Sequence, residues 1–268
     1  MMANANVLDL DGRQLKTVEL PMAFAEKVRR DLILRAVHAE STAKLQPQAH
    51  YLLAGMQTTA RYYGAMNSYR TGRHMGIAIR PREKLGGGVQ GKVKRIPSAV
   101  KGKRAHPHKI EKIIAENINS KEYQKAIRSA VSATSQPTYP KNDAAKSITF
   151  PIILSNGIEE VKKTKQMSGI ISKLGLGSAL ERGTEKTRRK GIRRLSKQRA
   201  YKKSILIVLG NDNGAVKAAN NLPGVDVCTV NKLTANVLAP GGVPGRITIW
   251  SEAAIEQLDR TIGAMKPE

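Results

Sequence analysis

The chain has 268 residues and a mass of 29.2 kDa, and 40% of its residues are hydrophobic, which suffices for one large domain or two small ones. Lysine and arginine total 46 against 21 aspartates and glutamates, so the formal charge is +25 and the isoelectric point is about 10.3, which favours a nucleic-acid partner. An anionic membrane surface is the competing partner, but only 4% of residues are aromatic and no basic amphipathic segment carries the bulky aromatics that membrane binding uses.

The N-terminal region predicts a small hairpin followed by a helix. Residues 1–10 lack the basic and apolar parts of a secretory signal, and no segment is apolar over the length of a bilayer span, so we expect a cytoplasmic protein. Residues 7–10 and 15–20 flank Asp11-Gly12, a pair that favours a tight turn between two strands. From about residue 26 to residue 43, apolar residues recur at helical spacing, which predicts an amphipathic helix.

The stretch from Gln46 to Lys109 is strongly basic and contains a single acid, Glu83. Its basic residues are Arg61, Arg70, Arg73, Arg80, Arg82, Lys84, Lys92, Lys94, Arg95, Lys101, Lys103, Arg104 and Lys109. Glycine and proline are frequent between them, so the backbone can bend along a phosphate-lined surface while the side chains neutralise it. Few apolar residues are available for a core, and we expect this stretch to fold only on a partner; a flexible insert without a ligand is the alternative.

Ordered structure is expected to resume at Lys109. Two apolar stripes, over residues 110–118 and 123–131, predict two consecutive helices, the second preceded by Asn119 and Glu122 in the pattern of a capping box. Residues 135–143 contain two prolines and indicate a surface loop, and the apolar run 150–154 indicates a short strand. Apolar residues near helical spacing then predict a helix over residues 158–174.

A second basic block, residues 181–203, precedes the most apolar strand of the chain. Its basic residues are Arg182, Lys186, Arg188, Arg189, Lys190, Arg193, Arg194, Lys197, Arg199, Lys202 and Lys203. The continuous apolar run 204–209 is typical of a strand buried on both faces. This arrangement predicts a phosphate-binding arm beside a rigid sheet.

The C-terminal part alternates between strand and helix patterns. Strands are expected at residues 204–209, 225–230 and 246–250, with a short helix at 215–220 and a short helix or loop at 231–238. Ser251 should cap a final helix. Cys228, the one cysteine, lies inside an apolar run, so it is expected to be a buried core thiol, and neither a disulfide within the chain nor a thiolate zinc cluster can form. The alternation predicts an α/β fold: a mostly parallel sheet with helices on both faces, plus the long irregular basic extension.

Motifs for catalysis, nucleotide binding and metal binding are weak. Residues 86–92 match phosphate-loop spacing, but Val93 stands where a magnesium-binding Ser or Thr is needed, and the flanking segments favour neither a strand before it nor a helix after it. The glycines of residues 175–180 indicate a helix C-cap rather than a dinucleotide fingerprint. His106 and His108 lack further metal ligands, so phosphate or base contact is favoured. We expect no catalytic site, no metal and no cofactor.

Several specific runs resemble the archaeal form of the universal large-subunit ribosomal protein family four. They are VLDLDG (7–12), VELP (18–21), RRDLILRAV (29–37), GR (72–73), IRPR (79–82), GKRAHP (102–107), YKKSIL (201–206), NLPGVDV (221–227), LAPGG (238–242) and GRITIW (245–250). The resemblance covers nearly the whole chain. It implies a globular α/β body, here residues 1–45 and 109–268, and an extension, residues 46–108, that reaches through the rRNA of the large subunit toward the peptide exit tunnel.

The resemblance implies a structural role rather than an enzymatic one. Its expected partners are large-subunit rRNA, neighbouring large-subunit proteins that include the L-twenty-two family at the tunnel, and the nascent peptide, without a membrane. The tunnel-proximal residues would be Arg70, Gly72, Arg73, Arg80 and Arg82. The expected rRNA-binding residues are Arg61, Arg70, Arg73, Arg80, Arg82, Lys84, Lys92, Lys94, Arg95, Lys101, Lys103, Arg104, His106, Lys109, Arg188, Arg189, Lys190, Arg193, Arg194, Lys197, Arg199, Lys202 and Lys203. Two alternatives remain open from the residues alone: an RNA chaperone or regulator acting off the ribosome, and a basic Rossmann-like nucleotide enzyme.

Overall fold

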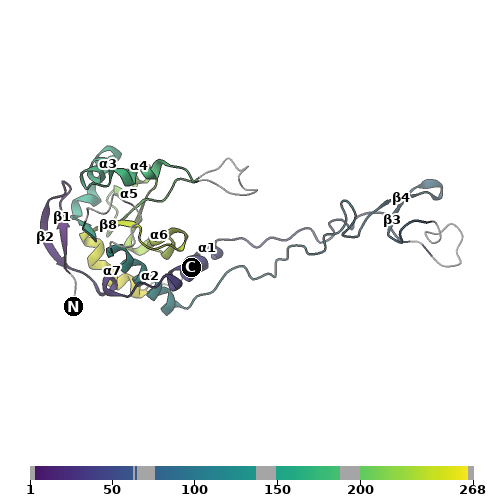
Figure 1. Ribbon diagram of the computed structural model, residues 1–268, viewed down its shortest axis with the longest axis horizontal. Helices are drawn as coiled ribbons and strands as arrows, with labels where there is room; N and C mark the ends of the chain where they lie inside the picture. The colour runs from purple at the N-terminus through teal and green to yellow at the C-terminus, as the bar shows by residue number, and fades with distance from the viewer. Residues whose placement is uncertain (1–3, 63, 65–75, 137–148, 188–199, 265–268) are drawn as a thin grey trace. The chain divides into compact units, whose positions relative to one another are not determined.

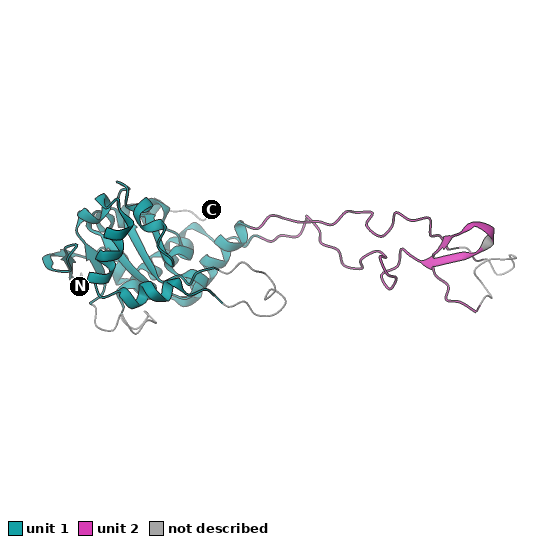
Figure 2. Ribbon diagram, turned by 90° about the horizontal axis from the view of Figure 1, so that it is seen from above, with its two compact units in different colours: residues 1–44, 115–268 teal, residues 45–114 magenta. Residues whose placement is uncertain are grey.

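The computed structural model describes residues 4–62, 64, 76–136, 149–187 and 200–264. Figure 2 colours its two compact units. One unit comprises residues 1–44 and 115–268 and is called the body below; the other, residues 45–114, is called the inserted unit.

The body is built on a six-stranded sheet with the strand order β2-β1-β5-β8-β6-β7 (Figure 1). The strands are β1 (Asn4–Leu8), β2 (Gln14–Glu19), β5 (Ile152–Leu154), β6 (Ile205–Leu209), β7 (Val225–Thr229) and β8 (Ile247–Ser251). The pair β1–β2 is the predicted hairpin and is antiparallel, whereas the pairs β1–β5, β5–β8, β6–β8 and β6–β7 are parallel. The predicted α/β fold with a mostly parallel sheet is confirmed.

Both faces of the central strands are buried because their apolar residues alternate between two cores. All five residues of β6 are fully buried. Leu206 and Val208 belong to the core on one face, while Ile205, Ile207 and Leu209 belong to the core on the other. A strand that is apolar on both sides needs a helical layer on each, which explains the continuous run seen in the sequence.

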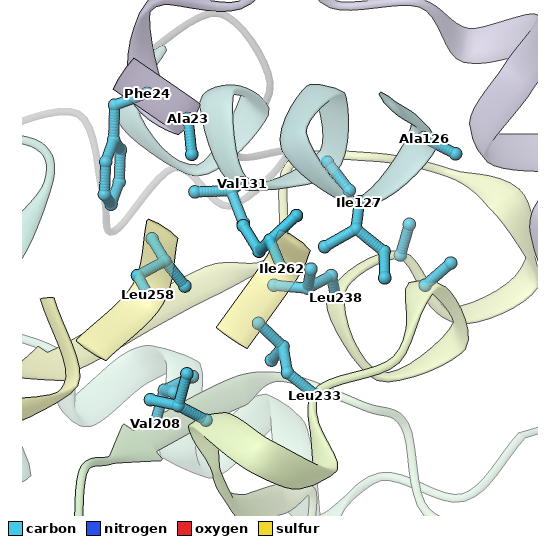
Figure 3. Packing of buried hydrophobic residues seen from close by; sticks show 14 of the residues in the cluster. Ala23, Phe24, Ala126, Ile127, Val131, Val208, Leu233, Leu238, Leu258 and Ile262 are labelled. Atoms are coloured by element: carbon cyan, nitrogen blue, oxygen red, sulfur yellow. The ribbon is translucent and has the colours of Figure 1, made fainter. Parts of the chain in front are cut away.

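The first face is covered by helices from both ends of the chain. They are α1 (Arg30–Ala43), α2 (Ser120–Ser135), α6 (Ala235–Leu238) and α7 (Glu252–Ala264), together with the short 3₁₀ helix η1 (Met22–Ala25). Figure 3 shows Ile127 and Val131 of α2 near Leu238 of α6 and Ile262 of α7. The predicted capping of α7 is confirmed, because the Ala254 N–H donates to Ser251 Oγ at 3.2 Å.

The second face is covered by α3 (Thr164–Lys173), α4 (Gly177–Thr184) and α5 (Ala215–Asn220). The glycine-rich turn between α3 and α4 is the predicted helix C-cap. Gly175 has φ of 76°, its N–H donates to the Ser172 carbonyl at 3.0 Å, and the Leu176 N–H donates to the Ile171 carbonyl at 3.1 Å. This is the Schellman arrangement, in which a left-handed glycine ends a helix.

Buried hydrogen bonds in the body fix the two helices that flank the inserted unit in sequence. Glu40 of α1 is 5% exposed; it accepts hydrogen bonds from the Tyr123 hydroxyl at 2.8 Å and from the Ala235 N–H at 2.7 Å. Close by in the chain, the Glu116 N–H donates to Thr42 Oγ1 at 3.0 Å. The chain segments that leave and re-enter the body are therefore held together.

The prediction of a helix over residues 110–118 is wrong. Ile110 and Ile113 are 64% and 87% exposed, and α2 begins only at Ser120. A helix this short is marginal in water unless its apolar stripe packs against something, and these isoleucines do not enter the core of the body. Asn119 is the N-cap residue of α2, as expected, but its side chain makes no capping hydrogen bond.

Other helix boundaries differ from the prediction in a specific way. The helix expected over 158–174 begins at Thr164, after the 3₁₀ helix η4 (Asn156–Glu160) and an extended Val161. The late start of the helix is explained by Glu159, whose carboxylate points inward and accepts hydrogen bonds at the ends of β6 and β8. The helix expected from residue 26 begins at Arg30. Most of the loop expected at 135–143 lies outside the described residues.

Candidate nucleic-acid interface

The inserted unit contains a two-stranded hairpin that is formed largely by basic segments. Strand β3 (Arg82–Lys84) pairs antiparallel with β4 (Gln90–Val93), and the backbones of Arg61 and Arg82 exchange two hydrogen bonds of 3.2 Å. The expectation that residues 81–85 would not form a strand is therefore wrong. The strand that follows replaces the helix that a phosphate loop requires, so residues 86–92 form the turn and most of the second strand of a hairpin rather than a nucleotide site.

Arg95 holds two separate segments of the inserted unit together. Its Nε and Nη2 both donate to the Met56 carbonyl, each at 3.3 Å, and its own carbonyl accepts from the Lys103 N–H at 3.3 Å. Arg95 and Lys101 have positive φ angles of 70° and 60°. Residues other than glycine rarely adopt this backbone conformation, and residues strained in this way cluster at functional sites.

Glycines allow direct backbone contact next to Arg95. A Cβ atom on Gly102 would lie 1.9 Å from the Ile96 carbonyl oxygen, and one on Gly55 would lie 2.5 Å from the carbonyl carbon and oxygen of Gly102. The sequence suggested that glycines of this stretch let the backbone bend. The structure shows that these two glycines also allow three segments of the backbone to lie in direct contact.

Besides Arg95 and the exposed Lys84, the predicted rRNA-binding residues in the described part of the inserted unit fall into two groups. Arg80 donates to Ser98 Oγ at 3.0 Å, Arg82 to the Ala78 carbonyl at 3.3 Å, and Lys94 lies 3.8 Å from Glu83, so these side chains also hold the unit together. The second group is exposed and makes no side-chain hydrogen bond or ion pair with the rest of the described chain. It comprises Arg61, Lys92, Lys101, Lys103, Arg104, His106 and Lys109. These side chains are available to phosphates.

The second basic block forms a hairpin stem where it is described. The Thr187 N–H donates to the Ala200 carbonyl and the Lys202 N–H to the Glu185 carbonyl, both at 2.9 Å. Lys202 pairs with Glu185, and Lys203 lies 2.5 Å from Asp226. The charges of these two predicted rRNA-binding residues are thus partly neutralised within the body.

Several predicted residues lie outside the described parts of the chain. In the inserted unit they are Arg70, Gly72 and Arg73, which include most of the residues expected near the tunnel. In the second basic block they are Arg188, Arg189, Lys190, Arg193, Arg194, Lys197 and Arg199.

The inserted unit also has a cavity of about 770 Å³ that sequence reasoning missed. It is lined by Leu45, Gln46, Gln48, Pro107, His108, Lys109, Lys112, Ile113 and Ile114. Of these, Lys109 was predicted to bind rRNA, and phosphate or base contact was favoured for His108. The charge pattern did not single out Gln46 and Gln48, because they are uncharged. Ile113 and Ile114 were expected in a helix of the body.

In the described part of the body, a buried glutamate takes the position at which a Rossmann-like fold would bind its nucleotide. In such folds a ligand binds beyond the carboxyl ends of adjacent strands whose following helices cover opposite faces, and β6 and β8 are such a pair. Glu159, only 4% exposed, fills this position: its Oε1 accepts from the Gly210 N–H at 2.8 Å and from Ser251 Oγ at 2.7 Å.

The thiol of Cys228 lies in an environment that disfavours its reaction. Cys228 packs against the core but is partly buried, not fully buried as expected, and burial raises the pKa of its thiol to about 12, which disfavours the nucleophilic thiolate. Within the described ranges no three His, Cys, Asp or Glu residues gather into a metal site. No helix in those ranges is long and apolar enough to cross a bilayer.

Comparisons with known proteins agree with one another. The family model described as the ribosomal protein L4/L1 family matches residues 18–261. The chain is 39% identical over 258 residues to the large ribosomal subunit protein uL4 of Methanocaldococcus jannaschii, which covers 95% of this chain and 97% of that protein. It is 39% identical over 260 residues to uL4 of Archaeoglobus fulgidus (95% and 97%), and 40% identical over 261 residues to uL4 of Methanococcoides burtonii (96% and 98%).

Proposed function

Because the chain belongs to the ribosomal protein L4/L1 family, we propose that it binds and organises the rRNA of the large ribosomal subunit through its inserted unit. Family membership implies a structural role in the ribosome rather than a catalytic one. It also accounts for the expected location on cytoplasmic large subunits. The resemblance to the archaeal form is confirmed by these relatives.

The observation that carries the proposal is the excess of exposed cations on a unit without a core. Ala60 is the one buried apolar side chain among the described residues of the inserted unit. The side chains of Arg61, Lys92, Lys101 and Arg104 are exposed and make no hydrogen bond or ion pair with the described chain. Phosphates can neutralise such side chains and release counterions, which offsets the entropy of ordering the unit on RNA.

The finer part of the proposal concerns the peptide exit tunnel. Arg80 and Arg82, together with Arg70, Gly72 and Arg73, would lie close to the tunnel, near a protein of the L-twenty-two family and the nascent peptide. Arg80 and Arg82 are braced by Ser98 and the Ala78 carbonyl. Such bracing supports a role in which they keep a fixed position.

Charge reversal in the inserted unit tests rRNA binding. We expect the triple variant Lys101→Glu, Lys103→Glu, Arg104→Glu to lose affinity for large-subunit rRNA and to show a shallower dependence of log affinity on log salt, by roughly 0.9 for each phosphate that is no longer neutralised. The matched control reverses Lys162, Lys163 and Lys165, three exposed lysines of the body. Equal losses in the two triple variants would contradict a dedicated role for the inserted unit.

Crosslinking tests the tunnel assignment. A photoreactive group placed along a stalled nascent peptide should capture this protein within large subunits, and mapping of the adduct should place it in residues 61–84. Adducts confined to the body, or none at any peptide position, would overturn the tunnel assignment while leaving rRNA binding intact.

A further inference from the structure

The cavity of the inserted unit combines an apolar surface with hydrogen-bonding amides. Leu45 and Ile113 line it and are 55% and 87% exposed, so together they give the cavity an apolar surface that is open to solvent. Gln46 and Gln48 line the same cavity and are also exposed. Each glutamine amide carries both donors and an acceptor, as the edge of a nucleobase does.

Ring and cationic groups complete the lining. His108 supplies an imidazole, which can stack on a base, and Pro107 lies beside it in the chain. Lys109 and Lys112 supply two exposed ammonium groups, and none of the described residues that line the cavity has a carboxylate. The volume of about 770 Å³ lies within the range of roughly 300–1,000 Å³ typical of pockets for small organic molecules.

We propose that this cavity holds an unstacked nucleotide of the large-subunit rRNA. The base lies against Ile113 and His108, its edge meets the amides of Gln46 and Gln48, and its phosphates pair with Lys109 and Lys112. RNA is recognised in this way at loops and bulges, where a base can leave the stack. The inference rests on the proposed rRNA-binding function and adds one base-specific contact to contacts that otherwise address phosphates.

The amides and the imidazole of the lining favour RNA over the other candidate occupant, an acidic segment of a neighbouring protein. Both would satisfy the lysines and the isoleucines. Only a base also uses two amides and a stacking ring in one cavity, so the glutamines and His108 decide between them.

The test compares two substitutions of equal charge in the full-length protein. Ile113→Asp places a carboxylate in the cavity, and Val100→Asp places one outside it at a side chain that is 83% exposed in the same unit. Neither side chain is buried, so both variants should fold. Large subunits are reconstituted with each protein, and the reactivity of unpaired rRNA bases toward base-modifying reagents is mapped.

We expect the unmodified protein and Val100→Asp to protect the same unpaired base, and Ile113→Asp to leave that base reactive. A second variant, His108→Ala, should weaken binding to that RNA segment roughly 10- to 100-fold, as loss of one stacked base implies. Identical protection patterns for Ile113→Asp and the unmodified protein would overturn the inference alone. If large subunits with Ile113→Asp instead lost a crosslink between the cavity and a neighbouring protein while all bases stayed protected, the inference would also be overturned. An unmodified protein that binds no large-subunit rRNA would instead overturn the proposed function.

Discussion

Ser251 donates a hydrogen bond to the buried carboxylate of Glu159 at 2.7 Å, and this pair joins the ends of three strands. Glu159 follows β5, Ser251 ends β8, and the Gly210 N–H just beyond β6 donates to Glu159 at 2.8 Å and to Ser251 Oγ at 3.1 Å. Related α/β folds use this location for a ligand, whereas here the protein fills it with its own side chain.

Removing this carboxylate should destabilise the body. We expect Glu159→Ala to lower the free energy of unfolding by about 2–4 kcal/mol, since each buried donor that loses its acceptor costs about 1–3 kcal/mol. Urea unfolding measures the change. The neighbouring Glu160 is exposed, so Glu160→Ala should stay within about 0.5 kcal/mol of the unmodified protein. Similar effects of the two variants would contradict a structural role for Glu159.

Two ion pairs of the same length should differ sharply in their contribution to stability. Arg246 Nη2 lies 2.7 Å from Asp226 Oδ2, and Arg29 Nη2 lies 2.7 Å from Asp31 Oδ2. The Arg246 side chain is 3% exposed, but that of Asp31 is 65% exposed. Asp226→Ala should therefore lower the free energy of unfolding by about 3 kcal/mol, because it leaves the buried charge of Arg246 without its carboxylate partner. Asp31→Ala should cost under about 1 kcal/mol. Thermal or urea unfolding of both variants checks the difference.

The same aspartate should make stability depend on acid pH. Burial raises the pKa of Asp226, but the hydrogen bond from Lys203 and the charge of Arg246 outweigh burial, so the net pKa is lowered. A lowered pKa in the folded state gives stability that is present above the unfolded value of about 3.9 and is lost as pH falls through the folded value. We expect the midpoint of urea unfolding to fall below about pH 4 more steeply in the unmodified protein than in Asp226→Asn. Parallel curves would rule out this contribution.

Two helical glycines should respond oppositely to alanine. A Cβ atom on Gly183 of α4 would lie 2.4 Å from the Pro223 carbonyl oxygen, so Gly183→Ala should destabilise the body by about 1–3 kcal/mol. A Cβ atom on Gly169 of α3 would meet nothing within 4 Å, and Gly169→Ala should stabilise it by about 0.5–1 kcal/mol through helix propensity. Urea unfolding decides the signs. A gain for Gly183→Ala would show that α4 can move away from β7.

The sequence predicted the sheet well because burial on both faces leaves a local signature. The run that became β6 is apolar throughout, and the turn pair Asp11-Gly12 marks the hairpin. The role of Glu159 was not predictable, since a carboxylate becomes buried only when strands distant in sequence bring donors to it. The expected helix over 110–118 does not form for a related reason. The periodicity of apolar residues shows which face of a helix could pack, but not whether another element is present to pack against it.

The candidate interface was predictable in part for the same reasons. Basic residues such as Lys101 and Arg104 stand out by composition, and they are exposed. Composition could not separate them from Arg95, which binds the Met56 carbonyl and holds the unit together. Nor could it reveal Gln46 and Gln48 at the cavity, because uncharged side chains in an irregular segment carry no periodic signal.

Protease sensitivity should distinguish the inserted unit from the body in the free protein. Lys101, Lys103 and Arg104 are exposed and lie in a unit whose described part buries one apolar side chain, so local opening costs little free energy. We expect trypsin to cut the free protein at these residues early, and to spare Lys121 and Lys125, which are exposed but lie in helix α2.

The same sites should be protected in assembled large subunits, because rRNA phosphates would cover the basic side chains and exclude the protease. Peptide mapping at matched trypsin ratios compares the two states, with Lys121 and Lys125 as internal controls. Rapid cleavage at Lys101–Arg104 in both states would mean that rRNA does not cover this segment. Protection in both states would mean that the inserted unit is stable by itself, and that its order does not depend on RNA.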